Sequence, residues 1–155
     1  MRAAKRQQEQ PRPLGETLRF MQKLWGLAHA LEVSSKRMGR TIGVTGPQRL
    51  VIRVVGQMPE ITARELAEML GIHPSTLTGI LGRLERQRFL RRAVDPLDRR
   101  LARFRLTPAG LAINRIRAGT VEGSVRRALG RADHDTIAKG SAMLQLLIDE
   151  LTRET

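Results

Sequence analysis

The sequence predicts a mainly helical fold that carries one small β-hairpin, and three observations lead to that class. Apolar residues recur at three- and four-residue steps over most of the chain, as in helices with one buried face. Gly and Pro punctuate these segments near their ends. Two short runs, residues 89–94 and 101–106, flank the turn sequence DPLD at residues 95–98. The predicted order is therefore helices, a hairpin, and two more helices.

Length and composition limit the classes of protein to consider. The chain has 155 residues, of which 41% are hydrophobic, enough for one ordinary domain with a core. No apolar run approaches the roughly 18 residues of a membrane span, and no apolar segment follows the charged N-terminus as in a secretory signal. The absence of cysteine excludes disulfides, thiolate nucleophiles and cysteine-based zinc sites, and it fits a reducing cytoplasm.

The charge balance points to a polyanionic partner. Lys and Arg number 28 against 15 Asp and Glu, a net charge of +13, which in a small protein favours nucleic acid. A membrane surface is the competing interpretation, but it favours lysine-rich amphipathic helices with exposed aromatic residues. Here aromatic residues make up only 3% and the cations are mostly arginine, which suits contacts with phosphate and guanine.

The first third of the chain is expected to hold an arm and two helices. Residues 1–13 are basic, rich in Gln and Pro and without apolar periodicity, so a flexible arm is expected there. Apolar periodicity then predicts a helix from Leu14 to about Gly39. The sequence Thr45-Gly46-Pro47 starts a second helix, which Gly56 closes.

The sequence of residues 62–84 has the pattern of a helix-turn-helix. Thr62 and Glu65 form a capping box that opens a short helix, and Gly71 suits the sharp turn after it. Pro74 begins a second helix that runs to about Arg88. The residues left exposed on that second helix are short, polar or basic, which is what a helix needs to read the major groove: Ser75, Thr76, Thr78, Gly79 and Arg83. A plain pair of antiparallel helices with polar solvent positions is the simpler alternative.

An arginine-rich segment follows directly and strengthens the DNA-binding interpretation. Between residues 83 and 105 nine arginines face three acidic residues, an excess of six positive charges. A hairpin beside a recognition helix is a wing, whose arginines can reach the DNA backbone or the minor groove. Thr107-Pro108 then starts a long helix expected to run to about Leu129, and Asp133 caps the last helix.

At this point the chain resembles the MarR family of bacterial regulators. The resemblance rests on ITARELAEMLGIHPSTLTGILGRLERQRFLRRAVDPLDRRLARFRLTPAG at residues 61–110 and is weakest at the first and last helices. It implies a winged helix-turn-helix with flanking dimerisation helices, in which residues 45–106 form the DNA-binding lobe. Residues 14–44 and 107–155 would then supply the dimer interface, and two lobes would bind a pseudo-palindromic operator.

The resemblance also implies roles for individual residues. Asp98 would orient an arginine of the wing, and one of the neighbouring arginines would enter the minor groove. His73 departs from the serine common at this cap position, so either the helix is capped more weakly or the imidazole caps it or touches phosphate. The DNA-binding candidates are thus Ser75, Thr76, Thr78, Gly79, Arg83, His73, Asp98, Arg99, Arg100 and Arg103.

A small aromatic or phenolic effector is a further implication, bound between the dimer helices and the lobe. Trp25 and His29 are then candidate pocket residues, although an ordinary core tryptophan and a surface histidine are the simpler interpretation that we favour. The histidines His29, His73 and His134 show no metal-ligand spacing, and no cofactor is expected. Arginines around the aspartates of the turn favour their ionised forms, which argues against general-acid catalysis.

We therefore expect a cytoplasmic, homodimeric transcription regulator, a repressor by analogy with the family, and no enzyme. An architectural DNA-binding protein without a ligand switch is the first alternative, and its lack of sequence preference would distinguish it. An RNA-binding module is the second, but the recognition helix and wing lack the aromatic residues on which RNA bases stack.

Overall fold

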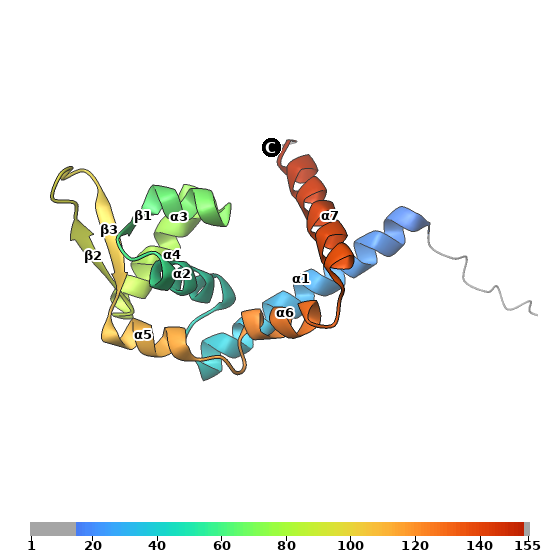
Figure 1. Ribbon diagram of the computed structural model, residues 1–155, viewed down its shortest axis with the longest axis horizontal. Helices are drawn as coiled ribbons and strands as arrows, with labels where there is room; N and C mark the ends of the chain where they lie inside the picture. Colours follow the sequence, from blue (N-terminus) through green and yellow to red (C-terminus); the bar gives the residue numbers. More distant parts are fainter. Residues whose placement is uncertain (1–14, 154–155) are drawn as a thin grey trace, which may run out of the picture.

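The computed structural model describes residues 15–153 and places seven helices and three strands there (Figure 1). The arm expected at residues 1–13 lies outside the described residues. The elements, in chain order, are α1 Glu16–Thr41, α2 Gly46–Gln57, β1 Ile61–Thr62, α3 Ala63–Leu70, α4 Pro74–Arg86, β2 Leu90–Val94, β3 Ala102–Leu106, α5 Pro108–Arg115, α6 Val121–Leu129 and α7 His134–Arg153. The fold is thus mainly helical with a small antiparallel sheet.

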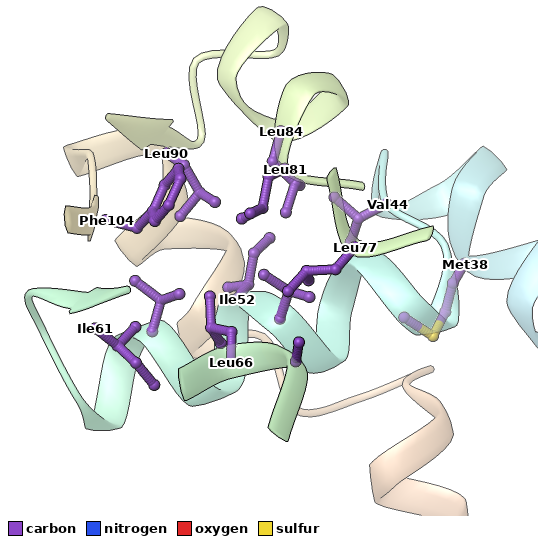
Figure 2. Packing of buried hydrophobic residues seen from close by; sticks show 13 residues of the cluster. Met38, Val44, Ile52, Ile61, Leu66, Leu77, Leu81, Leu84, Leu90 and Phe104 are labelled. Atoms are coloured by element: carbon purple, nitrogen blue, oxygen red, sulfur yellow. The ribbon is translucent and has the colours of Figure 1, made fainter. Parts of the chain in front are cut away.

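One hydrophobic core holds the lobe formed by α2, α3, α4 and the sheet (Figure 2). Its centre consists of apolar side chains that are at most 4% exposed, among them Ile52 of α2, Leu66 of α3 and Leu81 of α4. Phe104 and Leu90 bring the sheet into the same cluster. This core fixes α4 against the base of the hairpin.

The sheet has the order β1-β3-β2, with both pairs antiparallel. Leu90 pairs with Leu106 and Val94 with Ala102, so the expected hairpin is present in full register. The strand β1, in which Ile61 pairs with Phe104, was not predicted from the sequence. Two residues are too short a run to show the alternation by which strands are recognised.

Local signals in the sequence set the ends of α3. Glu65 N–H donates to Thr62 Oγ1 at 3.3 Å, and Thr62 N–H donates to Glu65 Oε2 at 2.7 Å, which completes the capping box. Gly71 ends the helix with φ +59°, in the left-handed region that glycine adopts without a steric penalty. The turn before α4 is therefore built by glycine, as the sequence predicted.

The expectation of one long helix from Pro108 to about Leu129 was wrong. The helix ends at Arg115, residues 116–120 form a connection, and α6 starts at Val121. Gly119 has φ +70° in that connection, and Thr120 caps α6 by accepting a hydrogen bond from Gly123 N–H at 3.1 Å. The apolar periodicity continues across the break, so the pattern alone did not reveal it.

α1 and α7 extend away from the lobe (Figure 1). Met38 is the one buried residue of α1, and α7 buries none of its described side chains. No helix within residues 15–153 is long and apolar enough to cross a membrane. Two long helices with exposed apolar side chains therefore stand beside a well-packed lobe.

Candidate nucleic-acid interface

The helix α4 buries one face and exposes the other. Leu77, Leu81 and Leu84 are at most 4% exposed and anchor the helix in the core. Thr76 exposes a hydroxyl that makes no hydrogen bond within the described chain, whereas Thr78 Oγ1 donates to the Pro74 carbonyl at 2.9 Å. The candidates on the exposed face, all from the first three turns, are Ser75, Thr76, Thr78, Gly79 and Arg83.

His73 caps this helix through its imidazole. Its Nδ1 accepts a hydrogen bond from Ser75 N–H at 3.3 Å and lies 2.7 Å from Ser75 Oγ. The imidazole thus replaces the side-chain oxygen of a usual cap and satisfies one N–H of the first turn. The first turn still leaves backbone N–H groups at an exposed helix N-terminus, where an anion is favoured.

The hairpin turn is held by Asp95. Its Oδ1 accepts hydrogen bonds from Leu97 N–H at 2.7 Å and Asp98 N–H at 3.0 Å. These two N–H groups, and then the guanidinium of Arg103, hold the pKa of Asp95 below its ordinary value of 3.8. The carboxylate is therefore a fixed acceptor in the wing and has the wrong shift for a general acid at neutral pH.

Asp98 orients Arg100 at the tip of the wing. Asp98 Oδ1 accepts from Arg100 N–H at 3.0 Å and from Arg100 Nε at 3.2 Å. The Arg100 side chain is 91% exposed, so its terminal nitrogen atoms face solvent. Leu97, at 96% exposure, stands beside it at the tip.

Arg103 lies on β3 opposite Ala93, near the hairpin turn, and is bound by the protein itself. Its Nε forms an ion pair with Asp95 Oδ2, and its Nη1 donates to the Glu60 carbonyl at 2.9 Å. Glu60 in turn forms an ion pair with Arg105. Of the DNA-binding candidates, Arg103 is therefore the one whose guanidinium already connects β3 to the turn before β1, and its role toward DNA stays a prediction.

A groove of about 440 Å³ separates α4 from the wing. Thr78 from α4 and Arg92 and Arg100 from the wing line it, together with Arg64 at the start of α3. The structure thus brings the recognition helix and the wing tip to one concave surface. Arg64 and Arg92 were not singled out from the sequence, although Arg92 belongs to the arginine-rich segment that was.

Several exposed arginines of α4 and the wing have no ion-pair partner among residues 15–153. Within residues 15–153, no carboxylate lies within ion-pair distance of Arg83, Arg91, Arg92 or Arg99, and all four are exposed. Exposed guanidinium groups without partners in the chain are available to phosphate oxygens. The surface formed by α4 and the wing is therefore suited to a polyanion.

A second cavity, of about 520 Å³, lies between α1, α2 and α6. Its lining is Leu31, Ser35, Gly46, Pro47, Leu50, Arg53, Ile72, Val121, Glu122 and Val125. Trp25 and His29 do not line it. Trp25 is 66% exposed and His29 is also exposed, both on α1, so the structure does not bring these two candidates to the cavity.

Metal binding has no support in the described part of the chain. Within residues 15–153, no group of three or more His, Asp or Glu side chains is placed to hold a metal ion. His73 caps α4, and His29 and His134 lie on α1 and at the start of α7.

Comparisons with known proteins agree with this geometry. A model of the MarR family matches residues 42–101. The HTH-type transcriptional regulator YsmB of Bacillus subtilis, itself described as uncharacterized, is 24% identical over 99 residues, which cover 64% of this chain and 68% of that protein.

Solved structures share the fold over nearly the whole chain. PcaV of Streptomyces coelicolor, solved with its natural ligand, has a TM-score of 0.72 at 23% identity and covers 88% of this chain and 96% of its own. MepR of S. aureus bound to DNA has a TM-score of 0.70 at 17% identity, with 90% and 99% covered. FabT of Streptococcus pneumoniae bound to DNA has a TM-score of 0.67 at 22% identity, with 90% and 100% covered.

The fold and the surface of α4 and the wing define a winged helix-turn-helix protein. The matched segment contains α3, α4 and the wing tip, the parts that form this surface. Residues 42–101 of the chain match the MarR family model, and the relative YsmB is described as an HTH-type transcriptional regulator.

Proposed function

We propose that this protein is a sequence-specific transcription regulator that binds duplex DNA as a homodimer. The observation that carries the proposal is the concave surface on which the exposed polar face of α4 meets the oriented Arg100 of the wing. The short side chains of α4 allow close approach to base edges in a major groove, and Thr76 offers a hydroxyl without a partner in the described chain.

Phosphate contacts supply much of the affinity in this proposal. Arg92 lines the groove, Arg91 and Arg99 are further exposed cations of the wing, and the N-terminus of α4 favours a phosphate. Each neutralised phosphate releases counterions, so binding weakens steeply as salt rises. Arg100 reaches the minor groove, where guanidinium groups respond to groove width.

A second copy of the chain covers the long helices. α7 has 20 residues and buries no described side chain, and Leu144, Leu146 and Ile148 on it are 48–65% exposed. On α1, Leu18 and Trp25 are more than half exposed. Helices gain most of their stability from packing an apolar face, so these faces need a partner. A two-fold dimer places two α4 helices about 34 Å apart, in successive major grooves.

Release of DNA by a small-molecule effector is the finer part of the proposal. The cavity between α1, α2 and α6 has mainly apolar walls and joins the lobe to the long helices. Suppose that a ligand binds this cavity more tightly when the two lobes are spaced so that they do not fit DNA. It would then weaken DNA binding, and the size of the effect would be set by the difference between its affinities for the two spacings. The phenolic acid 4-hydroxybenzoate is a suitable first probe, and Val125→Trp, which fills the cavity, should abolish its effect on DNA binding.

Selection of bound duplexes from a random pool tests the DNA-binding proposal. We expect enrichment of a pseudo-palindrome whose half-sites lie about 10 base pairs apart. If no sequence is enriched, the proposal is contradicted. An architectural DNA-binding protein would then be favoured, because the excess of positive charge is sufficient for binding without sequence preference. We further propose that the bound protein represses transcription, that it acts in the cytoplasm, and that it catalyses no reaction.

A further inference from the structure

Arg49 on α2 is the largest fully buried side chain in the described chain, with 1% exposure. Its Nη1 donates to the carbonyl of Ile113, and its Nη2 donates to the carbonyls of Ile116 and, at 3.4 Å, Asn114. Its Nε donates to Glu122 Oε1 at 2.7 Å. One guanidinium group therefore binds the end of α5, the connection after it and the first turn of α6.

The bonded carbonyls explain why the expected long helix is interrupted. The last carbonyl groups of a helix have no partner within it. At the end of α5, Arg49 from a neighbouring helix binds these groups. Arg53 and Arg117 also donate to the Asn114 carbonyl, at 3.3 and 2.8 Å, and the Ile113 carbonyl also accepts from Ile116 N–H at 3.1 Å. A planar guanidinium with five donors suits this task, whereas the ammonium of lysine carries its three donors on one nitrogen.

The position of Arg49 is as specific as its bonds. α2 belongs to the core of the lobe, through Val51, Ile52 and Val55. α6 packs against α1 and, through its first residue Val121, touches the edge of that core. The ion pair between Arg49 and Glu122 therefore crosses the boundary between the lobe and the long helices.

We propose that Arg49, together with Glu122, is a positioning residue that sets the angle between the DNA-binding lobe and the dimerisation helices. This inference rests on the proposed function for its consequence, because the angle fixes the half-site spacing that a dimer accepts. A buried ion pair is weak evidence for stability, since apolar residues of similar volume fill a core as well. We therefore assign the Arg49–Glu122 ion pair a role in setting this angle, and not a role in stability.

Electron–electron distance measurements between spin labels test the angle without DNA. The chain contains no cysteine, so Met69→Cys, on the exposed side of α3, gives one label per lobe. In this background we compare Glu122→Gln with Glu68→Gln. Both remove one carboxylate charge, but Glu68 pairs with Arg64 on the surface of α3, with both side chains more than 60% exposed.

We expect the distance distribution between the two lobes of the dimer to broaden at least twofold in Glu122→Gln and to stay unchanged in Glu68→Gln. The midpoint of thermal unfolding and the mass of the dimer would change if Glu122 had only a structural role. Both quantities should stay near those of the parent protein. Equal widths in the two variants would overturn the inference. A broadening accompanied by loss of the dimer or of cooperative unfolding would also overturn it.

Binding to duplexes with different half-site spacing then tests the consequence. The parent protein should prefer one spacing by at least tenfold over spacings longer or shorter by two base pairs. Glu122→Gln should reduce that preference below threefold, whereas Glu68→Gln should keep it. If the parent binds every duplex equally, the proposed function fails, and the distance measurement still decides whether Arg49 and Glu122 set the angle.

Discussion

The carboxylate of Asp98 binds Arg100 twice, at the backbone N–H at 3.0 Å and at Nε at 3.2 Å. An exposed pair of this kind contributes little to stability, about 0–1 kcal/mol. The pair instead sets the orientation of the Arg100 side chain, because it holds the guanidinium at Nε while the terminal nitrogens stay in solvent. The wing therefore presents an arginine that is already aimed when DNA arrives, which lowers the entropy lost on binding.

Replacing Arg100 by alanine should weaken binding to the cognate duplex by about tenfold or more, in the range of roughly 1–3 kcal/mol for an arginine that reads a groove. Fluorescence anisotropy measures the affinity, and light scattering confirms that the dimer is intact. Lys139→Ala on α7 is the matched control, because it removes one exposed cation that pairs with Asp135 far from the wing. Unchanged affinity in Arg100→Ala would refute the role assigned to the wing.

Replacing Thr76 by alanine should lower specificity more than general affinity. Its hydroxyl has no partner within the described chain, so it is available to a base edge, and losing it should cost about 1 kcal/mol of discrimination. The measured quantity is the ratio of affinities for cognate and unrelated duplexes at one salt concentration. An unchanged ratio, with both affinities intact, would place Thr76 outside the recognition surface.

The wing should loosen in acid because Asp95 accepts hydrogen bonds as a carboxylate. The pKa of Asp95 is lowered in the folded protein by the N–H groups of Asp98 and Leu97 and by Arg103. A lowered pKa means that the stabilisation is complete above the ordinary value of 3.8 and is lost as pH falls below it through the folded value. The protection factors of amide hydrogen exchange in residues 94–103, which correct for the intrinsic pH dependence of exchange, should therefore be high at neutral pH and fall below about pH 4.

Asp95→Asn isolates this carboxylate. The variant should exchange faster in the wing at neutral pH, because the amide oxygen is a weaker acceptor and Arg103 loses its ion pair. Its protection factors in the wing should then change less between neutral pH and acid than those of the wild type. The same acid dependence in both proteins would show that another group is responsible.

Gly110 should tolerate no side chain. A Cβ atom at this position would lie 2.0 Å from the backbone oxygen of Phe89, so α5 or the start of β2 would have to shift. We expect Gly110→Ala to lower the free energy of unfolding by about 1–3 kcal/mol, as overpacked sites do. Urea unfolding followed by circular dichroism, at one protein concentration, measures it.

Gly79→Ala is the matched control for Gly110→Ala. Gly79 lies within α4, and a Cβ there would meet no atom within 4 Å. Alanine should stabilise that helix by about 0.5–1 kcal/mol relative to glycine. Equal stability of the two variants would contradict the close approach of Gly110 to Phe89.

The sequence was informative where structure is set by neighbouring residues. Thr62 and Glu65 predicted the start of α3, Gly71 predicted the turn, and Pro74 and Pro108 marked the starts of α4 and α5. The exposed face of α4 followed from the spacing of its leucines. These features depend on contacts within a few residues, which a pattern can record.

Features set by distant residues were not predictable in the same way. At the break after Arg115, the carbonyl of Ile113 is bound by Arg49, which lies more than sixty residues earlier in the chain. The binding of Arg103 to Asp95 and Glu60 appears only once β3 is placed beside β1. Periodicity predicted a buried face around Trp25, whereas this residue is 66% exposed in the single chain.

The most direct test of the central claim is an anisotropy titration against the DNA that flanks the protein's own gene, with an unrelated duplex as control, at two salt concentrations. The account predicts a preference of about 10³-fold or more for the flanking DNA. It also predicts that both affinities fall steeply with salt. Binding of neither duplex, or equal binding of both together with no enriched site in the selection from random duplexes, would contradict it.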